Sequence, residues 1–164
     1  MLFRQFSYFK FLLQATNQHG VHSPFMYDFV TKGLYTKGSS NIKLVDFTLD
    51  HRFSKKEEKI LKKTINYFKP TSIIINFKNK SITLDKTFNL LYFNYLSINE
   101  ILKIKRIYPN SFIIIKDIHQ NKPAVKNWLE ITQLQEATVT LDLFYFGLIF
   151  FRKEQSKEHF KIRV

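Results

Sequence analysis

The chain has 164 residues, a length typical of one domain, and 45% of them are hydrophobic, which is enough to build a core. It contains no cysteine, which excludes a disulfide framework and a thiolate zinc site. The formal net charge is +13 and is concentrated in residues 51–110, where 13 Lys and Arg face 4 Asp and Glu. Such a field favours nucleic acid, an anionic membrane or an acidic protein as a partner, and a merely solubilising lysine face is an equal alternative.

The first segment, MLFRQFSYFKFLLQ, is apolar but has neither the pattern of a signal peptide nor that of a membrane span. Arg4, Gln5 and Lys10 interrupt it, and no small-residue cleavage site follows. A membrane span would need about 18 consecutive apolar residues. We therefore expect a cytoplasmic protein without a transmembrane segment.

This first segment is predicted to form a helix, because its apolar residues recur at helical spacing. Apolar residues also occupy the opposite side, which predicts burial on more than one face. We expect the main stripe to pack in the core; self-association through this helix or a membrane-surface helix is the alternative. The stripe consists of Leu2, Phe6, Phe9 and Leu13, and the opposite side carries Tyr8 and Phe11.

A second helix is predicted after a loop. Ser23 is a candidate N-cap with Pro24 at the first helical position, and Gly33 is expected to end the helix. We expect its inward side to carry Phe25, Phe29 and Val30.

A third helix, rich in lysine, is predicted from Ser54 to Phe68. Ser54-Lys55-Lys56-Glu57 has the pattern of a capping box, and Pro70 stops the helix. Its lysines lie opposite an apolar arc. Together with two lysines that follow the next strand, we predict that they form the strongest positive patch: Lys55, Lys59, Lys62, Lys63, Lys78 and Lys80.

Three apolar runs predict the core strands of a sheet, over residues 72–77, 89–93 and 111–116. Residues 82–84 are a further, short candidate strand. Alternating residues near the C-terminus predict an antiparallel hairpin over residues 137–152 that ends the fold.

Two further helices separate these strands. The capping box Ser97-Ile98-Asn99-Glu100 begins the first, which ends near Tyr108. The second runs from Asn121 to Leu134, and we expect Val125, Trp128 and Leu129 to face inward. In the hairpin that follows, Tyr145-Phe146-Gly147 is expected to make the turn.

The order strand, helix, strand, helix, strand, strand is that of half of a doubly wound α/β sheet. We therefore expect an α/β protein with a reduced, Rossmann-like sheet, flanking helices, N-terminal helices and a C-terminal antiparallel hairpin. It is expected to form a single domain over residues 1–164, with an N-terminal helical segment over 1–35 and the α/β core over 54–164.

Three stretches resemble a known family, and together they cover about two thirds of the chain. They are TNQHGVHSPFMYDFVTKGLY, then Leu90–Asn94 paired with Ile113–His119, and finally TVTLDLFYFGLIFFRKEQSKEHFKIRV. The chain is similar to a bacterial group of class I S-adenosylmethionine-dependent methyltransferases that resembles the small-molecule O-methyltransferases. The resemblance implies an α/β fold and S-adenosylmethionine as cofactor.

The chain departs from this family where the cofactor would bind. The family carries an E-x-G-x-x-x-G turn after the first strand, whereas this chain has Asn76-Phe77-Lys78-Asn79-Lys80 and no glycine between Gly38 and Gly147. Only eleven residues, from Lys78 to Phe88, lead to the next strand, fewer than a parallel crossover needs. The cofactor-binding half of the sheet is therefore interpreted as deleted.

Few candidate catalytic residues remain at the strand ends. Asn94 stands where the family has an aspartate, and Lys116-Asp117 where it has an acidic pair, with His119 close behind. Clustered oxygen ligands would be needed for a hard cation, and an adjacent lysine repels a metal or pairs with Asp117. Asp117 with His119 as a general-base pair is a weaker alternative. We expect neither a metal nor a bound cofactor.

Two functions compete at this point. The first is a non-catalytic, methyltransferase-like protein that acts as a basic interaction module for RNA or an acidic protein. The second is an S-adenosylmethionine-dependent methyltransferase whose cofactor site is rebuilt or completed by another chain. The missing Gly-rich turn favours the first.

Overall fold

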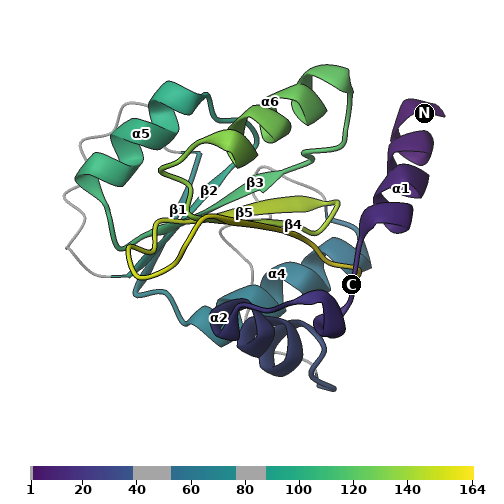
Figure 1. The fold of residues 1–164 in the computed structure, drawn as a ribbon, viewed down its shortest axis with the longest axis horizontal. Helices are drawn as coiled ribbons and strands as arrows, with labels where there is room; N and C mark the ends of the chain where they lie inside the picture. Colours follow the sequence, from purple (N-terminus) through teal and green to yellow (C-terminus); the bar gives the residue numbers. More distant parts are fainter. Residues whose placement is uncertain (1, 39–52, 77–87) are drawn as a thin grey trace. The chain divides into compact units, whose positions relative to one another are not determined.

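The computed structural model describes residues 2–38, 53–76 and 88–164 and has an α/β fold with a six-stranded sheet (Figure 1). Two compact units make up the chain. One unit combines the first helix with residues 71–163 and holds the whole sheet; the other is formed by residues 16–70. The single domain over 1–164 stays a prediction. The candidate strand 82–84 and two lysines of the predicted patch, Lys78 and Lys80, lie outside the described residues.

Three parallel strands occupy one side of the sheet, whose order is β1-β2-β3-β5-β4-β6. They are β1 (Ser72–Ile75), β2 (Asn89–Phe93) and β3 (Phe112–Lys116). All five residues of β2 are buried, as expected for a parallel strand covered on both faces. The three predicted core strands are thereby confirmed, and their carboxyl ends lie at one edge of the sheet.

The predicted C-terminal hairpin is confirmed as β4 (Val139–Asp142) paired antiparallel with β5 (Phe146–Phe150). The prediction that this hairpin ends the fold is wrong, because β6 (Glu158–Lys161) follows it and pairs parallel with β4. β5 lies between β3 and β4, antiparallel to both. The sequence signal for β6 is weak because only Phe160 is buried in it.

The turn of this hairpin lies earlier than predicted, at Leu143 to Tyr145, with Phe144 at a φ of 68°. Gly147 belongs to β5 instead. A Cβ placed on it would lie 2.5 Å from Cζ3 of Trp128, so glycine is needed here for the close approach of the indole ring.

Helices α5 (Ile98–Ile107) and α6 (Lys122–Gln133) lie on the same face of the sheet (Figure 1). A capping box at Ser97 confirms the predicted start of α5. Trp128 is 2% exposed in the core beneath α6, but the prediction that Leu129 faces inward is wrong, because it is 50% exposed. One residue further along a helix is a rotation of about 100°, which carries Leu129 away from the sheet. The core includes Leu91, Phe93, Ile101, Ile113, Trp128, Ile131 and Ile149.

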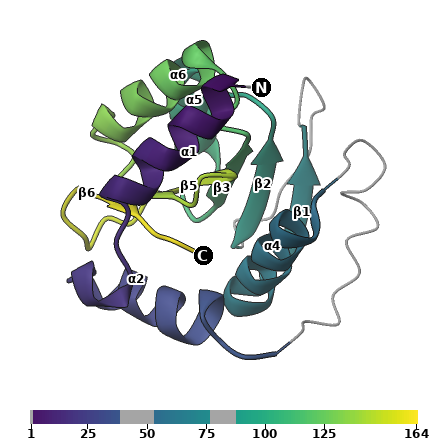
Figure 2. The same ribbon diagram turned by 90° about the vertical axis from the view of Figure 1, so that its right-hand side faces the viewer.

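Helix α1 (Leu2–Gln14) forms where predicted (Figure 2). The face that it turns inward is the opposite of the predicted one. Phe11 is 4% exposed and packs with Ala15 and Phe144, with Tyr8 beside them. The stripe expected in the core is instead exposed, because polar contacts made by the other face hold that face against the sheet. The exposed residues are Leu2, Phe6, Phe9 and Leu13.

The unit of residues 16–70 contains α2 (Pro24–Asp28), a π-helical segment (Phe29–Leu34) and α4 (Lys55–Phe68). Ser23 caps α2 as predicted, and Ser54 begins α4 with the predicted capping box. Gly33 does not end the helix. It lies inside the π-helical turn, where a Cβ would meet the rings of Phe29 and Tyr67 at 2.8 Å and 3.1 Å.

Candidate functional site

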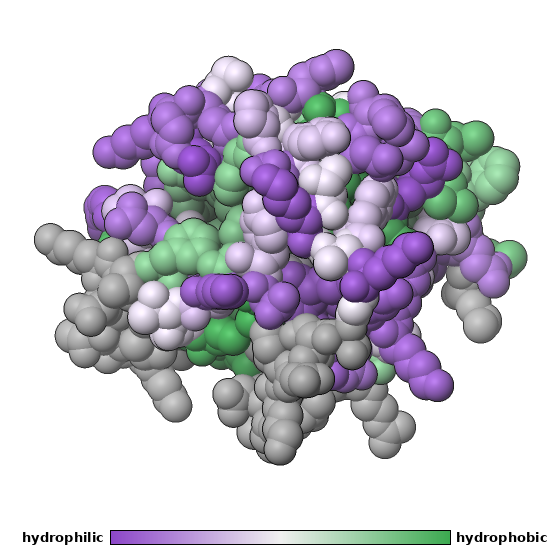
Figure 3. Space-filling model, turned by 90° about the horizontal axis from the view of Figure 1, so that it is seen from below, coloured by the Kyte–Doolittle hydropathy of each residue, from purple (hydrophilic) through white to green (hydrophobic). Residues whose placement is uncertain are grey.

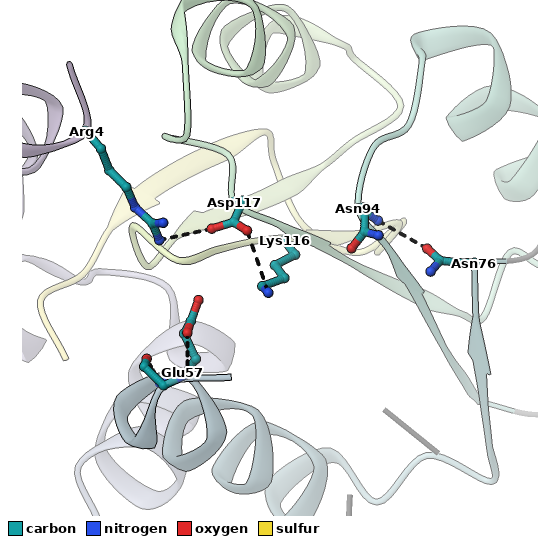
Figure 4. Close-up of polar contacts among 7 residues, drawn as sticks. Arg4, Glu57, Asn76, Asn94, Lys116 and Asp117 are labelled. Carbon is teal, nitrogen blue, oxygen red and sulfur yellow. Dashed lines mark hydrogen bonds and ion pairs between the residues drawn. The ribbon is translucent and has the colours of Figure 1, made fainter. Parts of the chain in front are cut away.

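The carboxyl ends of the three parallel strands bring two predicted site residues, Asn94 and Asp117, to one edge of the sheet together with Asn76. Asn76 follows β1, Asn94 follows β2 and Asp117 follows β3 (Figure 4). In open α/β sheets, ligands bind outside this edge. This edge of the sheet is therefore the expected position of a ligand-binding or catalytic site.

Asp117 is already engaged by two cations. Its Oδ1 lies 3.0 Å from the Arg4 guanidinium and its Oδ2 lies 3.7 Å from Lys116 Nζ (Figure 4). The Lys116–Asp117 pairing raised from the sequence is therefore present, and Arg4 is an addition from α1. Asp117 is in the left-handed region, with a φ of 56°, and its N–H donates to Tyr145 O at 2.8 Å. The carboxylate connects α1 to the end of β3.

The two asparagines hold the neighbouring strand ends together. The backbone N–H of Asn94 donates to Asn76 Oδ1 at 3.3 Å, and the N–H of Asn76 donates to Tyr92 O at 2.8 Å (Figure 4). Asn76 is left-handed, with a φ of 46°, which asparagine tolerates better than most residues. Both contacts stabilise the turns that leave β1 and β2.

His119 does not pair with Asp117, so the suggested general-base pair is wrong. Its Nε2 lies 2.8 Å from Oδ2 of Asp142, and its Nδ1 lies 2.8 Å from Ser7 Oγ. Because the carboxylate accepts, Nε2 carries the proton, and Ser7 is the partner of the other nitrogen. The other oxygen of Asp142 accepts from the N–H of Phe144 at 2.8 Å. This network joins α1, the segment after β3 and the end of β4.

Ser7, His119 and Asp142 are the residue types of a nucleophilic triad, but their arrangement differs from one. In a triad the serine meets Nε2 and the carboxylate meets Nδ1, whereas here the two nitrogens are exchanged. Exposure is 8% for Ser7, 9% for His119 and 1% for Asp142. The His119 ring also stacks on Phe144, at 4.9 Å between centroids. Because these three side chains are buried and packed, the network is better explained as a structural link between α1 and the strand ends than as a substrate-binding site.

Sequence reasoning missed Ser7 and Asp142. The alternating pattern predicts Asp142 on the polar side of its strand, yet Thr140 and Asp142 are 0% and 1% exposed. An acidic residue at the end of such a strand was a signal for a buried partner, because a carboxylate is rarely buried unpaired. Ser7 carried no such signal, since serine is common on exposed helix faces.

The lysines of α4 divide into exposed and engaged groups. Lys55 and Lys59 are exposed, whereas Lys62 forms an ion pair with Glu58 at 2.6 Å. Lys63 donates to Leu34 O at 2.6 Å and to Thr36 O at 2.8 Å, and burial lowers its pKa, with a further contribution from Lys59. Of the four described lysines in the predicted patch, Lys55 and Lys59 are therefore the ones available to a ligand. The face seen in Figure 3 is largely hydrophilic.

A cavity of about 120 Å³ also lies in the unit of residues 16–70, beside Lys63. Lys32 and Tyr67 contribute to its wall. Lys32 is paired with Asp28 at 2.9 Å and Lys63 with two carbonyl groups, so both cations are engaged. Burial raises the pKa of Tyr67, and Asp28 adds to the effect.

Comparison with known proteins gives no relative: no protein-family model, no curated protein and no solved structure matches the chain. Among the described residues, no group of three or more His, Asp or Glu side chains is arranged to hold a metal ion. Within the same residues, no helix is both long and apolar enough to cross a membrane.

Proposed function

We propose that this protein is a methyltransferase-like α/β protein that does not catalyse methyl transfer and that binds RNA through its basic surface. The absence of methyl transfer is supported mainly by the two ion pairs that Asp117 forms. Its carboxylate, at the end of β3, contacts Arg4 and Lys116 and joins α1 to the sheet. A carboxylate used in this way is not available to a metal, a ribose or an acceptor hydroxyl.

The asparagines support the same conclusion. A cofactor at this edge would use the strand ends of β1 and β2 for close backbone approach. Here Asn76 Oδ1 accepts from the Asn94 N–H, and both strand ends are tied to each other. Binding S-adenosylmethionine at this position would require these contacts to be rebuilt.

The charge supports RNA as the partner. The net charge of +13 includes exposed Lys55 and Lys59, one turn apart on α4. Phosphate neutralisation by such lysines releases counterions and gives sequence-independent affinity. The reduced methyltransferase-like architecture then serves as a rigid support for a basic surface.

The test is fluorescence anisotropy with a labelled single-stranded RNA of about 16 nucleotides, titrated at several salt concentrations. We expect log K to fall linearly with log salt. Lys55→Gln with Lys59→Gln should reduce the magnitude of that slope by about 1.4, or about 0.7 for each lost phosphate contact on a single strand.

The matched control is Lys122→Gln with Lys126→Gln, which removes the same charge from α6. It should keep the wild-type slope. An equal change in both double variants, or no binding of RNA at low salt, would contradict the proposal. Preferential binding of polyglutamate would point to an acidic protein partner instead.

Isothermal titration calorimetry with S-adenosylmethionine tests the proposal that the protein does not catalyse methyl transfer. We expect no dissociation constant tighter than about 100 μM, which corresponds to about 5.5 kcal/mol. A tighter one, weakened by Asp117→Ala, would favour the alternative of a methyltransferase with a rebuilt cofactor site.

A further inference from the structure

The outward face of α1 is a continuous apolar stripe, which we call the outer stripe: Leu2, Phe6, Phe9 and Leu13. Their exposed fractions are 83%, 70%, 62% and 73%. Four large apolar side chains in one row are unusual on the surface of a monomer. In Figure 3, a group of hydrophobic residues lies at the right-hand margin, the side on which α1 lies in Figure 1.

The outer stripe cannot be buried by rolling the helix. The opposite face is held by Arg4 on Asp117 at 3.0 Å and by Ser7 on His119 at 2.8 Å. Phe11 adds a hydrophobic anchor, with 4% exposure. Rotation of α1 would break an ion pair, leave His119 with an unsatisfied nitrogen and expose Phe11, so the sheet fixes the stripe in its outward position.

The spacing of the stripe is that of a helix–helix seam. Its members are separated by four, three and four residues, the alternation of a and d positions in a coiled coil. A stripe restricted to these positions is narrower than the apolar face that a helix presents to a globular core. The pattern therefore fits another helix rather than a broad surface.

The order of residues in the outer stripe indicates which helix this partner is. Leu-Phe-Phe-Leu at spacing four, three, four is the same in both chain directions. In an antiparallel pair with two-fold symmetry, Leu2 meets Leu13 of the second copy, and Phe6 meets Phe9. A two-fold contact requires a self-complementary surface, and this stripe provides one. We propose that two copies of this chain form a dimer by packing their α1 helices antiparallel along the outer stripe.

The buried area is sufficient for a weak dimer. Exposed Leu and Phe side chains of this size present on the order of 500 Å² on each copy. The pair would bury about 1,000 Å², the lower end for specific association. We expect a dissociation constant on the order of micromolar. Because the net charge of +13 repels a second copy, association should strengthen as salt is added.

Sedimentation velocity over a range of protein concentrations, at low and high salt, tests the dimer. Phe6→Gln with Phe9→Gln should weaken association at least tenfold without changing the circular dichroism spectrum, because both side chains are exposed. Leu129→Gln is the matched control: it removes a half-exposed apolar side chain from α6 and should leave association unchanged.

Cysteine pairing tests the antiparallel arrangement, and the natural chain contributes no background thiol. A mixture of Leu2→Cys and Leu13→Cys chains should form a disulfide between the two types. Neither variant alone should do so, because equivalent residues would then be about 16 Å apart along the helices, beyond the reach of about 7 Å between Cα atoms.

Three results would overturn the proposal. One is a monomer at all concentrations, and another is cross-linking of each cysteine variant with itself, which indicates parallel helices. The third is a monomer that binds anionic vesicles and is released by salt, which would make the stripe a membrane-surface helix instead.

Discussion

Ser7 Oγ lies 2.8 Å from Nδ1 of His119, a residue 112 positions later in the chain. Together with Asp142 on the other ring nitrogen, this contact joins the first helix to the ends of two strands. The network determines which face of α1 packs against the sheet. It therefore also determines which face is left for a partner.

Ser7→Ala should lower the free energy of unfolding by about 1–2 kcal/mol, because His119 Nδ1 loses its partner in a buried position. Urea denaturation measures the change. Ser156→Ala, at an exposed position, is the matched control and should change stability by less than about 0.5 kcal/mol. Equal effects of the two substitutions would show that the network does not hold α1.

Gly147→Ala should destabilise the protein by about 1–3 kcal/mol, because the new methyl group would lie 2.5 Å from the Trp128 ring. Thermal or urea unfolding measures this. In a Trp128→Leu background, which makes room for the methyl group, the same substitution should cost less. Additive effects of the two substitutions would argue against a close contact between glycine and indole.

We expect the free energy of unfolding to decrease in acid because of His159. Burial lowers its pKa from 6.5 to about 4, an effect that Asp142 partly opposes. Because the folded pKa lies below the unfolded value, the unfolded chain binds the proton first. The free energy of unfolding should therefore fall as pH decreases from about 6.5 to about 4. His159 as a whole residue is exposed at the surface, so water screens part of this effect.

The measurement is the difference in unfolding free energy between pH 7 and pH 5, for the wild type and for His159→Asn. Asparagine cannot be protonated and keeps a polar atom near Thr140, which lies 2.9 Å from His159 Nδ1. We expect the wild type to lose about 1 kcal/mol more than the variant. Identical losses in both proteins would assign the acid sensitivity to other groups.

The amino-acid sequence by itself determined the local structure. The capping boxes at Ser54 and Ser97 and the three apolar runs depend on residues that are close in the chain, and α4, α5 and the parallel strands formed where they predicted. The antiparallel hairpin followed from alternation in the same way. Charge and composition are also properties of the sequence alone.

Only the tertiary structure decided the features that join distant segments. The position of β5 between β3 and β4, the pairing of β6 with β4, and the partners of His119 all depend on contacts across long stretches of chain. Helix α1 shows the physical reason. Both of its sides are apolar, so hydrophobicity could not choose between them. The polar contacts of Arg4 and Ser7 determine which face packs against the sheet. Only this orientation of α1 gives Asp117 and His119 these partners.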